Sequence, residues 1–194
     1  FGPGGSGAVY KVDRRTGVPS VFTQLPNQVS NNPVETPSLG NITFDPNTES
    51  FFVSNFEDGR IYHLDRSGSV LATFDHGAPD ATALGEAAPL GERVWGVATH
   101  EDRLYYSVWS ENHRNFPAPE ACESVGRNSI FSVDITGGDF GSSQHELDVL
   151  PSFVPSTPAA QAGGTCTAGA EYTNPVSDIS FSAGGKMLLA ERTM

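Results

Sequence analysis

Two stretches of this chain place an aromatic side chain beside carboxylates, a combination that can hold a sugar or a peptide. The residues concerned are Phe56, Glu57, Asp58, Trp109, Glu111 and His113. An aromatic face supplies apolar contact area, and its polar neighbours supply hydrogen bonds that orient a ligand. We interpret the six residues as a candidate binding surface. The competing interpretation is that Phe56 and Trp109 pack at the ends of strands.

Three similar runs of the sequence carry Asn41, Gly96 and Asp178 at equivalent places, each directly before a β-branched residue. Carboxylate and amide oxygens are the ligands that Ca²⁺ prefers. Where such runs converge, Asn41 and Asp178 are candidate metal ligands, and Ca²⁺ is the cofactor that the pattern suggests. The alternative is that both side chains bond to backbone groups nearby.

The other residues able to do chemistry form no catalytic motif. Residues 2–7 match the G-x-G-x-x-G spacing of dinucleotide-binding loops, but they precede a strand-like run instead of opening a helix. The histidines are too scattered for the H-x-H or H-E-x-x-H patterns of zinc sites. No G-x-S-x-G nucleophile motif is present. The motifs therefore favour binding over catalysis.

The two cysteines, Cys122 and Cys166, both fall in stretches rich in small and polar residues. We predict that they form a disulfide joining two loops, which points to an oxidising compartment. The alternative is two free thiols.

One phrase occurs three times, at residues 7–17, 59–68 and 128–137. Each copy is a β-branched and aromatic run that ends in an aspartate and a glycine turn. We expect the closing aspartates, Asp13, Asp65 and Asp134, to accept hydrogen bonds from backbone N–H groups of their turns. A strand-and-turn unit that recurs is typical of repeat architectures.

The runs that flank each copy extend the repeat to four short strands joined by tight turns. This unit predicts an all-β fold, a β-propeller of four-stranded antiparallel blades. The blade pieces are expected at about residues 8–25, 39–76, 93–151 and 176–194. They amount to two full and two half blades, too few to close a ring, so the remaining blades of a larger chain are expected partners. A β-sandwich is the rival fold, but it has no reason to repeat a phrase.

Connections of very different length follow from this strand order. The short ones are expected at residues 45–49, 66–68, 100–102, 137–143 and 183–185. The long ones are residues 26–38, 77–92, 110–127 and 154–175, and they all project from the opposite face of the blades. Long loops are uncommon unless they are functional or disordered. We therefore expect the long-loop face to carry the function, with drift of loop length on a rigid scaffold as the alternative.

Charge narrows the choice of partner. The formal net charge of −12 repels phosphate backbones and anionic headgroups, so nucleic acid and membrane surfaces are poor partners. No apolar run approaches the ~20 residues of a membrane helix, which excludes membrane insertion. Acidity favours solubility and, more specifically, cation binding.

The pattern I-x-F-D-P, F-F-V-S and I-Y-x-L-D-x-x-G, which rests on residues 42–44, 51–54 and 61–68, resembles propellers with NHL, gluconolactonase-like and PQQ-type repeats. The gluconolactonase-like enzymes bind a metal at the channel mouth, and the resemblance implies that role for Asn41 and Asp178. The spacing between the repeats is longer than that of the compact NHL unit.

These observations lead to one main hypothesis and two alternatives. The main hypothesis is an extracellular, cell-surface or periplasmic propeller module that recognises a protein or a glycan through its long loops. The first alternative is a Ca²⁺-dependent hydrolase or lactonase similar to the gluconolactonases. The second is a structural scaffold whose loops serve self-assembly.

Overall fold

The computed structural model describes residues 4–27, 39–77, 88, 92–109, 128–149 and 175–192. The strands in these residues are β1 (Ala8–Val12), β2 (Pro19–Gln24), β3 (Leu39–Asp45), β4 (Ser50–Asn55), β5 (Arg60–Leu64), β6 (Val70–Asp75), β7 (Arg93–His100), β8 (Arg103–Trp109), β9 (Ser129–Asp134), β10 (Ser143–Asp148), β11 (Val176–Phe181) and β12 (Met187–Glu191). A single short 3₁₀ turn, η1 (Thr136–Gly138), interrupts this pattern within the described residues. The prediction of an all-β fold is confirmed.

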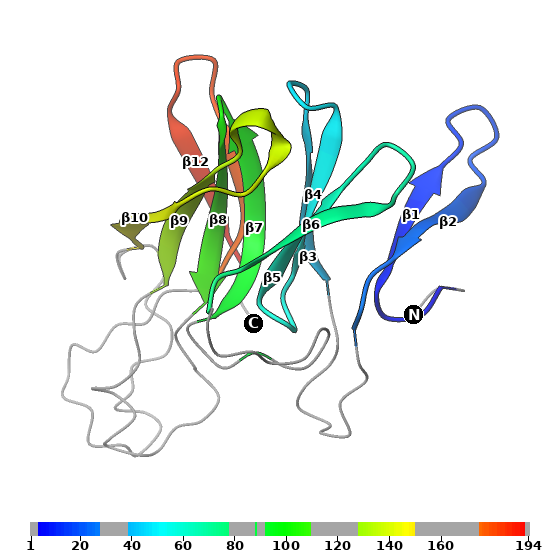
Figure 1. Cartoon of the computed structure of the whole chain (residues 1–194), viewed down its shortest axis with the longest axis horizontal. Helices are drawn as coiled ribbons and strands as arrows, with labels where there is room; N and C mark the ends of the chain where they lie inside the picture. The colour runs from blue at the N-terminus through cyan, green and yellow to red at the C-terminus, as the bar shows by residue number, and fades with distance from the viewer. Residues whose placement is uncertain are drawn as a thin grey trace.

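The strands pair with their neighbours in sequence to form four antiparallel sheets. The first sheet is β1–β2, the second is β3–β4–β5–β6, the third is β7–β8–β9–β10 and the fourth is β11–β12. Figure 1 shows the first sheet at one side of the molecule, the second beside it and the third beyond the second, with the fourth overlapping the third in this view. The second and third sheets are therefore complete four-stranded units, and the outer two have two strands each.

Aspartates close several of the tight turns, as the repeated phrase predicts. Asp65 Oδ1 accepts bonds from the backbone N–H groups of Ser67 at 2.7 Å and Ser69 at 2.9 Å. Asp13 and Asp134 accept equivalent bonds in their own turns. Gly68 follows with φ at 92°, a left-handed conformation that a side chain would strain.

Apolar side chains fill the space between each sheet and the next. The core between the first and second sheets is built around Leu25, Val53, Tyr62 and Leu64. The core between the second and third contains Phe52, Ile61, Val94, Val97, Leu104, Tyr106, Val108, Val133 and Ile135. The core between the third and fourth contains Ala98, Ile130, Val149, Val176 and Ile179. Each inner sheet is thus covered on both faces.

Two serines in equivalent positions join successive sheets through hydrogen bonds. Ser54 of β4 accepts a bond from Asn41 N in its own sheet at 2.8 Å and donates to the Trp95 carbonyl of β7. Ser107 of β8 accepts from Gly96 N at 2.8 Å and donates to the Val176 carbonyl of β11 at 2.7 Å. One serine therefore links β3 to β7, and the equivalent serine of the next sheet links β7 to β11 in the same manner.

The antiparallel order gives the row of sheets two different ends. The hairpin turns at residues 46–49, 66–69, 101–102 and 182–186 lie at one end, which we call the short-turn end. The strand ends next to residues 28–38, 110–127 and 150–174 lie at the other, which we call the long-connection end (Figure 1). Of the residues that the model describes, none belongs to a helix of the length and apolarity needed to cross a membrane.

Candidate functional site

Three aromatic rings meet at the long-connection end. Phe56 follows β4, Trp95 lies near the start of β7 and Trp109 ends β8. The Phe56 ring centroid lies 4.7 Å from that of Trp95 and 5.4 Å from that of Trp109. Because the rings come from two different sheets, their contact depends on the way the sheets pack.

Two arginines cover this group of rings. The guanidinium carbon of Arg93 lies 5.6 Å from the Phe56 centroid, and that of Arg192 lies 5.8 Å from the Trp95 centroid. Both distances fall within the range of cation–π attraction. We call the five residues the aromatic platform. The platform combines three aromatic rings with two cationic side chains.

The platform also contains a buried donor. The side chain of Trp109 is buried, and its Nε1 atom has no hydrogen-bond partner within the described part of the chain. A buried polar group without a partner costs free energy, about 1–3 kcal/mol in proteins.

Glu57 and Asp58, predicted as members of the binding surface, lie inside the protein. Asp58 Oδ2 accepts a 2.5 Å bond from the Tyr62 hydroxyl, and its Oδ1 accepts a 3.0 Å bond from Arg60 N. Burial, together with the bond to Asp58, raises the pKa of Tyr62 far above its usual value. These contacts give Asp58 a structural role in the turn that carries Phe56.

The six predicted surface residues are thus brought together only in part. Phe56 and Trp109 stack on each other, and Glu57 lies in the same turn as Phe56. Glu111 and His113 lie outside the described residues, as do Cys122 and Cys166, whose pairing stays a prediction. The sequence reasoning missed Trp95 and the two arginines. The sequence signal that could have identified Trp95 is its place directly before Gly96, near the start of the first strand of a sheet.

Asn41 and Asp178, the predicted metal ligands, are brought into direct contact. Asn41 Nδ2 donates a 2.8 Å bond to Asp178 Oδ1 and a 3.3 Å bond to the Ser177 carbonyl. Asn41 Oδ1 accepts a bond from Ile42 N at 2.7 Å. Gly96 adjoins the pair, because a Cβ placed there would lie 3.2 Å from Asp178 N.

This pair does not fit Ca²⁺ as it stands. The ion takes about 6–8 oxygen ligands, whereas Asn41 turns its nitrogen toward the carboxylate. No group of three or more His, Cys, Asp or Glu side chains able to hold a metal occurs among the described residues. The pair instead links the second sheet to the fourth and bonds backbone groups, which is the alternative considered for these residues from the sequence.

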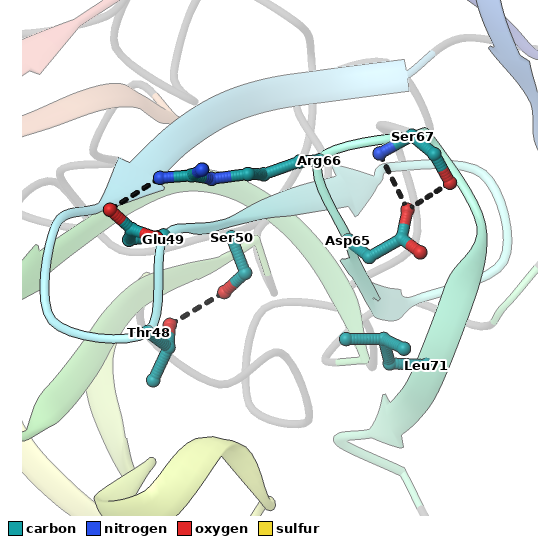
Figure 2. Close-up of a pocket in the computed structure, with 7 residues that line it drawn as sticks. All are labelled: Thr48, Glu49, Ser50, Asp65, Arg66, Ser67 and Leu71. Carbon is teal, nitrogen blue, oxygen red and sulfur yellow. Dashed lines mark hydrogen bonds and ion pairs between the residues drawn. The ribbon is translucent and has the colours of Figure 1, made fainter.

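A pocket of about 330 Å³ opens at the short-turn end of the second sheet. Its lining residues are Thr48, Glu49, Ser50, Asp65, Arg66, Ser67 and Leu71. Figure 2 shows Arg66 in an ion pair with Glu49 along one side, and Asp65 bonded to Ser67 on the other. The polar groups of the lining are therefore largely engaged with one another.

Beneath the pocket, Ser50 Oγ lies 2.7 Å from His63 Nε2, a contact of the kind that activates a nucleophile. Desolvation lowers the pKa of His63, whose ring stacks on Phe52 with centroids 4.5 Å apart. Both Ser50 and His63 are buried, and among the residues that the structure describes no carboxylate bonds the other ring nitrogen of His63. The pair lacks the orienting group and the access that a catalytic triad requires.

No protein-family model, no curated protein and no solved structure matches this chain in the comparisons made with each. The geometry of the described residues is therefore the basis for any statement about function.

Proposed function

We propose that this chain is part of a β-propeller in which the four sheets are two complete blades and two half blades. The contact between Asn41 of β3 and Asp178 of β11 supports this architecture. It reaches from the second sheet to the fourth, although the third lies between them, so the first strands converge while the sheets fan out. In a propeller the first strands of the blades converge in this way around a central axis.

The repeated serine link also supports a propeller. Ser54 and Ser107 join each sheet to the next through the same kind of hydrogen bond. A link that repeats between successive sheets repeats their relative rotation, and successive equal rotations lead to a ring. A sandwich, in contrast, has only one interface between two sheets.

The function we propose is recognition of a partner through the long-connection end. The observation that carries it is the aromatic platform of Phe56, Trp95, Trp109, Arg93 and Arg192. Tryptophan and arginine dominate the residues whose truncation weakens binding most in known interfaces. The platform lies at the end from which the long connections leave.

The partner class we propose is a protein or a glycan met outside the cell, at its surface or in the periplasm. Aromatic faces and arginine donors suit both. A disulfide between Cys122 and Cys166 belongs to this proposal, since it requires an oxidising compartment. The lactonase alternative has less support, because the contact between Asn41 and Asp178 leaves too few oxygen ligands for Ca²⁺.

The experiment starts with the purified chain on a glycan array and on a displayed peptide library, to obtain one ligand whose Kd is measured by biolayer interferometry. Arg192→Ala is then the test variant, because Arg192 is exposed and we expect its loss to leave the fold intact. We expect its Kd to rise about tenfold, equivalent to about 1.4 kcal/mol, as the cation over Trp95 is removed.

Arg66→Ala is the matched control, since Arg66 is also exposed but pairs with Glu49 at the short-turn end. Its Kd should equal that of the parent chain. Equal weakening by both substitutions, or no weakening by either, would show that the ligand binds elsewhere. A chain that selects no ligand from either collection would contradict the binding function itself.

A further inference from the structure

One turn of the repeated unit is longer than its counterpart and reaches the neighbouring sheet. Residues 65–69 join β5 to β6 in the second sheet, whereas residues 135–142 join β9 to β10 in the third. Figure 1 shows this longer turn, in yellow, at the short-turn end between the second and third sheets. We call residues 135–142 the crossing turn.

Backbone hydrogen bonds fix the crossing turn to its own sheet. Ile135 N donates to the Asp102 carbonyl at 2.9 Å, and Gly141 N donates to the Asp134 carbonyl at 2.8 Å. Within the turn, Gly138 N donates to the Ile135 carbonyl at 2.9 Å. Gly138 and the glycine before it both have left-handed φ, at 91° and 75°. Because glycine has wide conformational freedom, the shape of the tip depends on what the tip packs against.

The tip packs against side chains of the second sheet. The ring centroid of Phe140 lies 5.4 Å from that of Phe74, 5.7 Å from that of Phe52 and 6.2 Å from that of His63. Gly138 adjoins the same histidine, because a Cβ placed there would lie 3.7 Å from His63 Cε1. His63 therefore lies at the centre of the contact between the crossing turn and the second sheet.

Beneath the crossing turn, a chain of hydrogen bonds runs from His63 to the lining of the pocket at the short-turn end. His63 is 3% exposed, and its Nε2 atom lies 2.7 Å from Ser50 Oγ. Ser50 Oγ lies 2.6 Å from Thr48 Oγ1, which donates a 2.6 Å bond to Asp45 Oδ2. Ser50 and Thr48 both line the pocket. The crossing turn thus covers buried polar groups that border an open cavity.

Protonation of His63 would place a positive charge inside this contact. Burial lowers the pKa of His63 below the ordinary 6.5, and it outweighs two carboxylates that favour the protonated ring. One is Asp139 on the crossing turn, and the other is Asp45 on the second sheet. A buried charge costs free energy until water reaches it. The imidazolium therefore favours any conformation in which the ring is hydrated.

We infer that protonation of His63 releases the crossing turn from the second sheet, so that the turn is an acid-operated cover over the Ser50–His63 pair and the adjoining pocket. The tip is the part that can move most easily, since ring contacts hold it and two glycines precede Phe140. Its release admits water to His63 without separating the strands. The cover lies at the short-turn end, so it does not depend on the binding function proposed for the aromatic platform.

Hydrogen–deuterium exchange of the 194-residue chain tests this inference, read by mass spectrometry and corrected for the intrinsic exchange rate at each pH. Between about pH 7.5 and about pH 5, protection of residues 136–141 should fall about tenfold, because the released state takes up the proton more readily. Protection of residues 66–69, in the shorter turn of the second sheet, should stay the same.

His63→Gln is the test variant, because glutamine stays neutral and can still bond Ser50. Its crossing turn should be equally protected at both pH values. His76→Gln is the matched control, since His76 packs against Phe131 and lies 3.0 Å from the Tyr106 hydroxyl instead. This control should keep the tenfold change of the parent chain.

Phe140→Ala provides a second test that does not depend on the folding of His63→Gln. Without the ring contacts, the crossing turn should be poorly protected at both pH values. Four results would overturn the inference. These are equal protection of the parent turn at both pH values, stronger protection in acid through an ion pair of His63 with Asp139, a loss in acid that persists in either variant, and a loss that spreads equally to β5.

Discussion

The two turns that flank β5 are both closed by an aspartate, but in opposite surroundings. Asp65, at the short-turn end, is only partly buried and accepts bonds from Ser67 and Ser69 in its own turn. Asp58, at the long-connection end, is buried and accepts bonds from Arg60 N and the Tyr62 hydroxyl. The first turn can form in water by itself. The second requires the packed protein around it, and in return it holds Phe56 in place for the aromatic platform.

The largest effect should come from Asp58→Ala. Its loss leaves the buried Tyr62 hydroxyl and Arg60 N without their acceptor, which should lower the free energy of unfolding by about 3 kcal/mol. Urea unfolding followed by tryptophan fluorescence measures the change. Asp65→Ala, the more accessible counterpart, should cost clearly less. Equal losses would mean that burial does not distinguish the two turns.

Lowering the pH should reduce the stability of the protein in two separate steps, the first from buried histidines and the second from aspartates at the short-turn end. Burial lowers the pKa of His63 and His76 below the ordinary 6.5, so the unfolded chain takes up their protons first. The two histidines contribute fully to the free energy of unfolding above pH 6.5. This contribution is lost as the pH falls toward their pKa values in the folded protein.

The aspartates of the short turns titrate later. Hydrogen bonds from turn groups lower the pKa of Asp13, Asp65 and Asp134 below the ordinary 3.8. These carboxylates contribute to the free energy of unfolding above pH 3.8. The contribution is lost as the pH falls below that value toward their pKa values in the folded protein. Urea midpoints measured from pH 8 to pH 2 should show both declines, and the triple Asp→Asn variant should lose only the second. A single decline near pH 4 in the parent chain would contradict the assignment to the histidines.

The smallest effect is expected at Glu101, in the turn between β7 and β8. Its φ of 53° is left-handed, which costs about 1 kcal/mol in a residue with a side chain. Glu101→Gly relieves this cost but increases the freedom of the unfolded chain, so the net gain should be about 0.5 kcal/mol, or about 1–2 °C in Tm. Calorimetry would detect it, and a fall in Tm would show that the Glu101 side chain makes a contact worth more than its strain.

The strands were predictable from the sequence because their information is local. A run such as residues 50–55 alternates between two faces and ends at turn residues, so it identifies a strand without reference to the rest of the chain. The equivalence of Ile42, Val97 and Ile179 also followed from pattern alone, and it anticipated that Asn41 and Asp178 would come close.

Only two of the five platform residues, Phe56 and Trp109, were predicted, because the other three depend on packing between sheets. Trp95 reaches Phe56 across an interface, and Arg192 reaches Trp95 from the fourth sheet. The burial of Glu57 and Asp58 has the same origin, since Ala88 N donates a 2.7 Å bond to the Glu57 carbonyl from a segment distant in sequence. Charged residues in a turn suggest exposure unless tertiary contacts cover them.

The hydrogen bond between Asn41 and Asp178 has a consequence for the order of folding. It joins residues 137 positions apart, whereas each hairpin pairs strands that are close in sequence. During synthesis a hairpin can form as soon as its second strand leaves the ribosome, but Asn41 has to wait for β11. Contacts of such long sequence separation form late and slow the final stage of folding. We therefore expect the sheets to assemble in chain order, with the link from the second sheet to the fourth among the last to form.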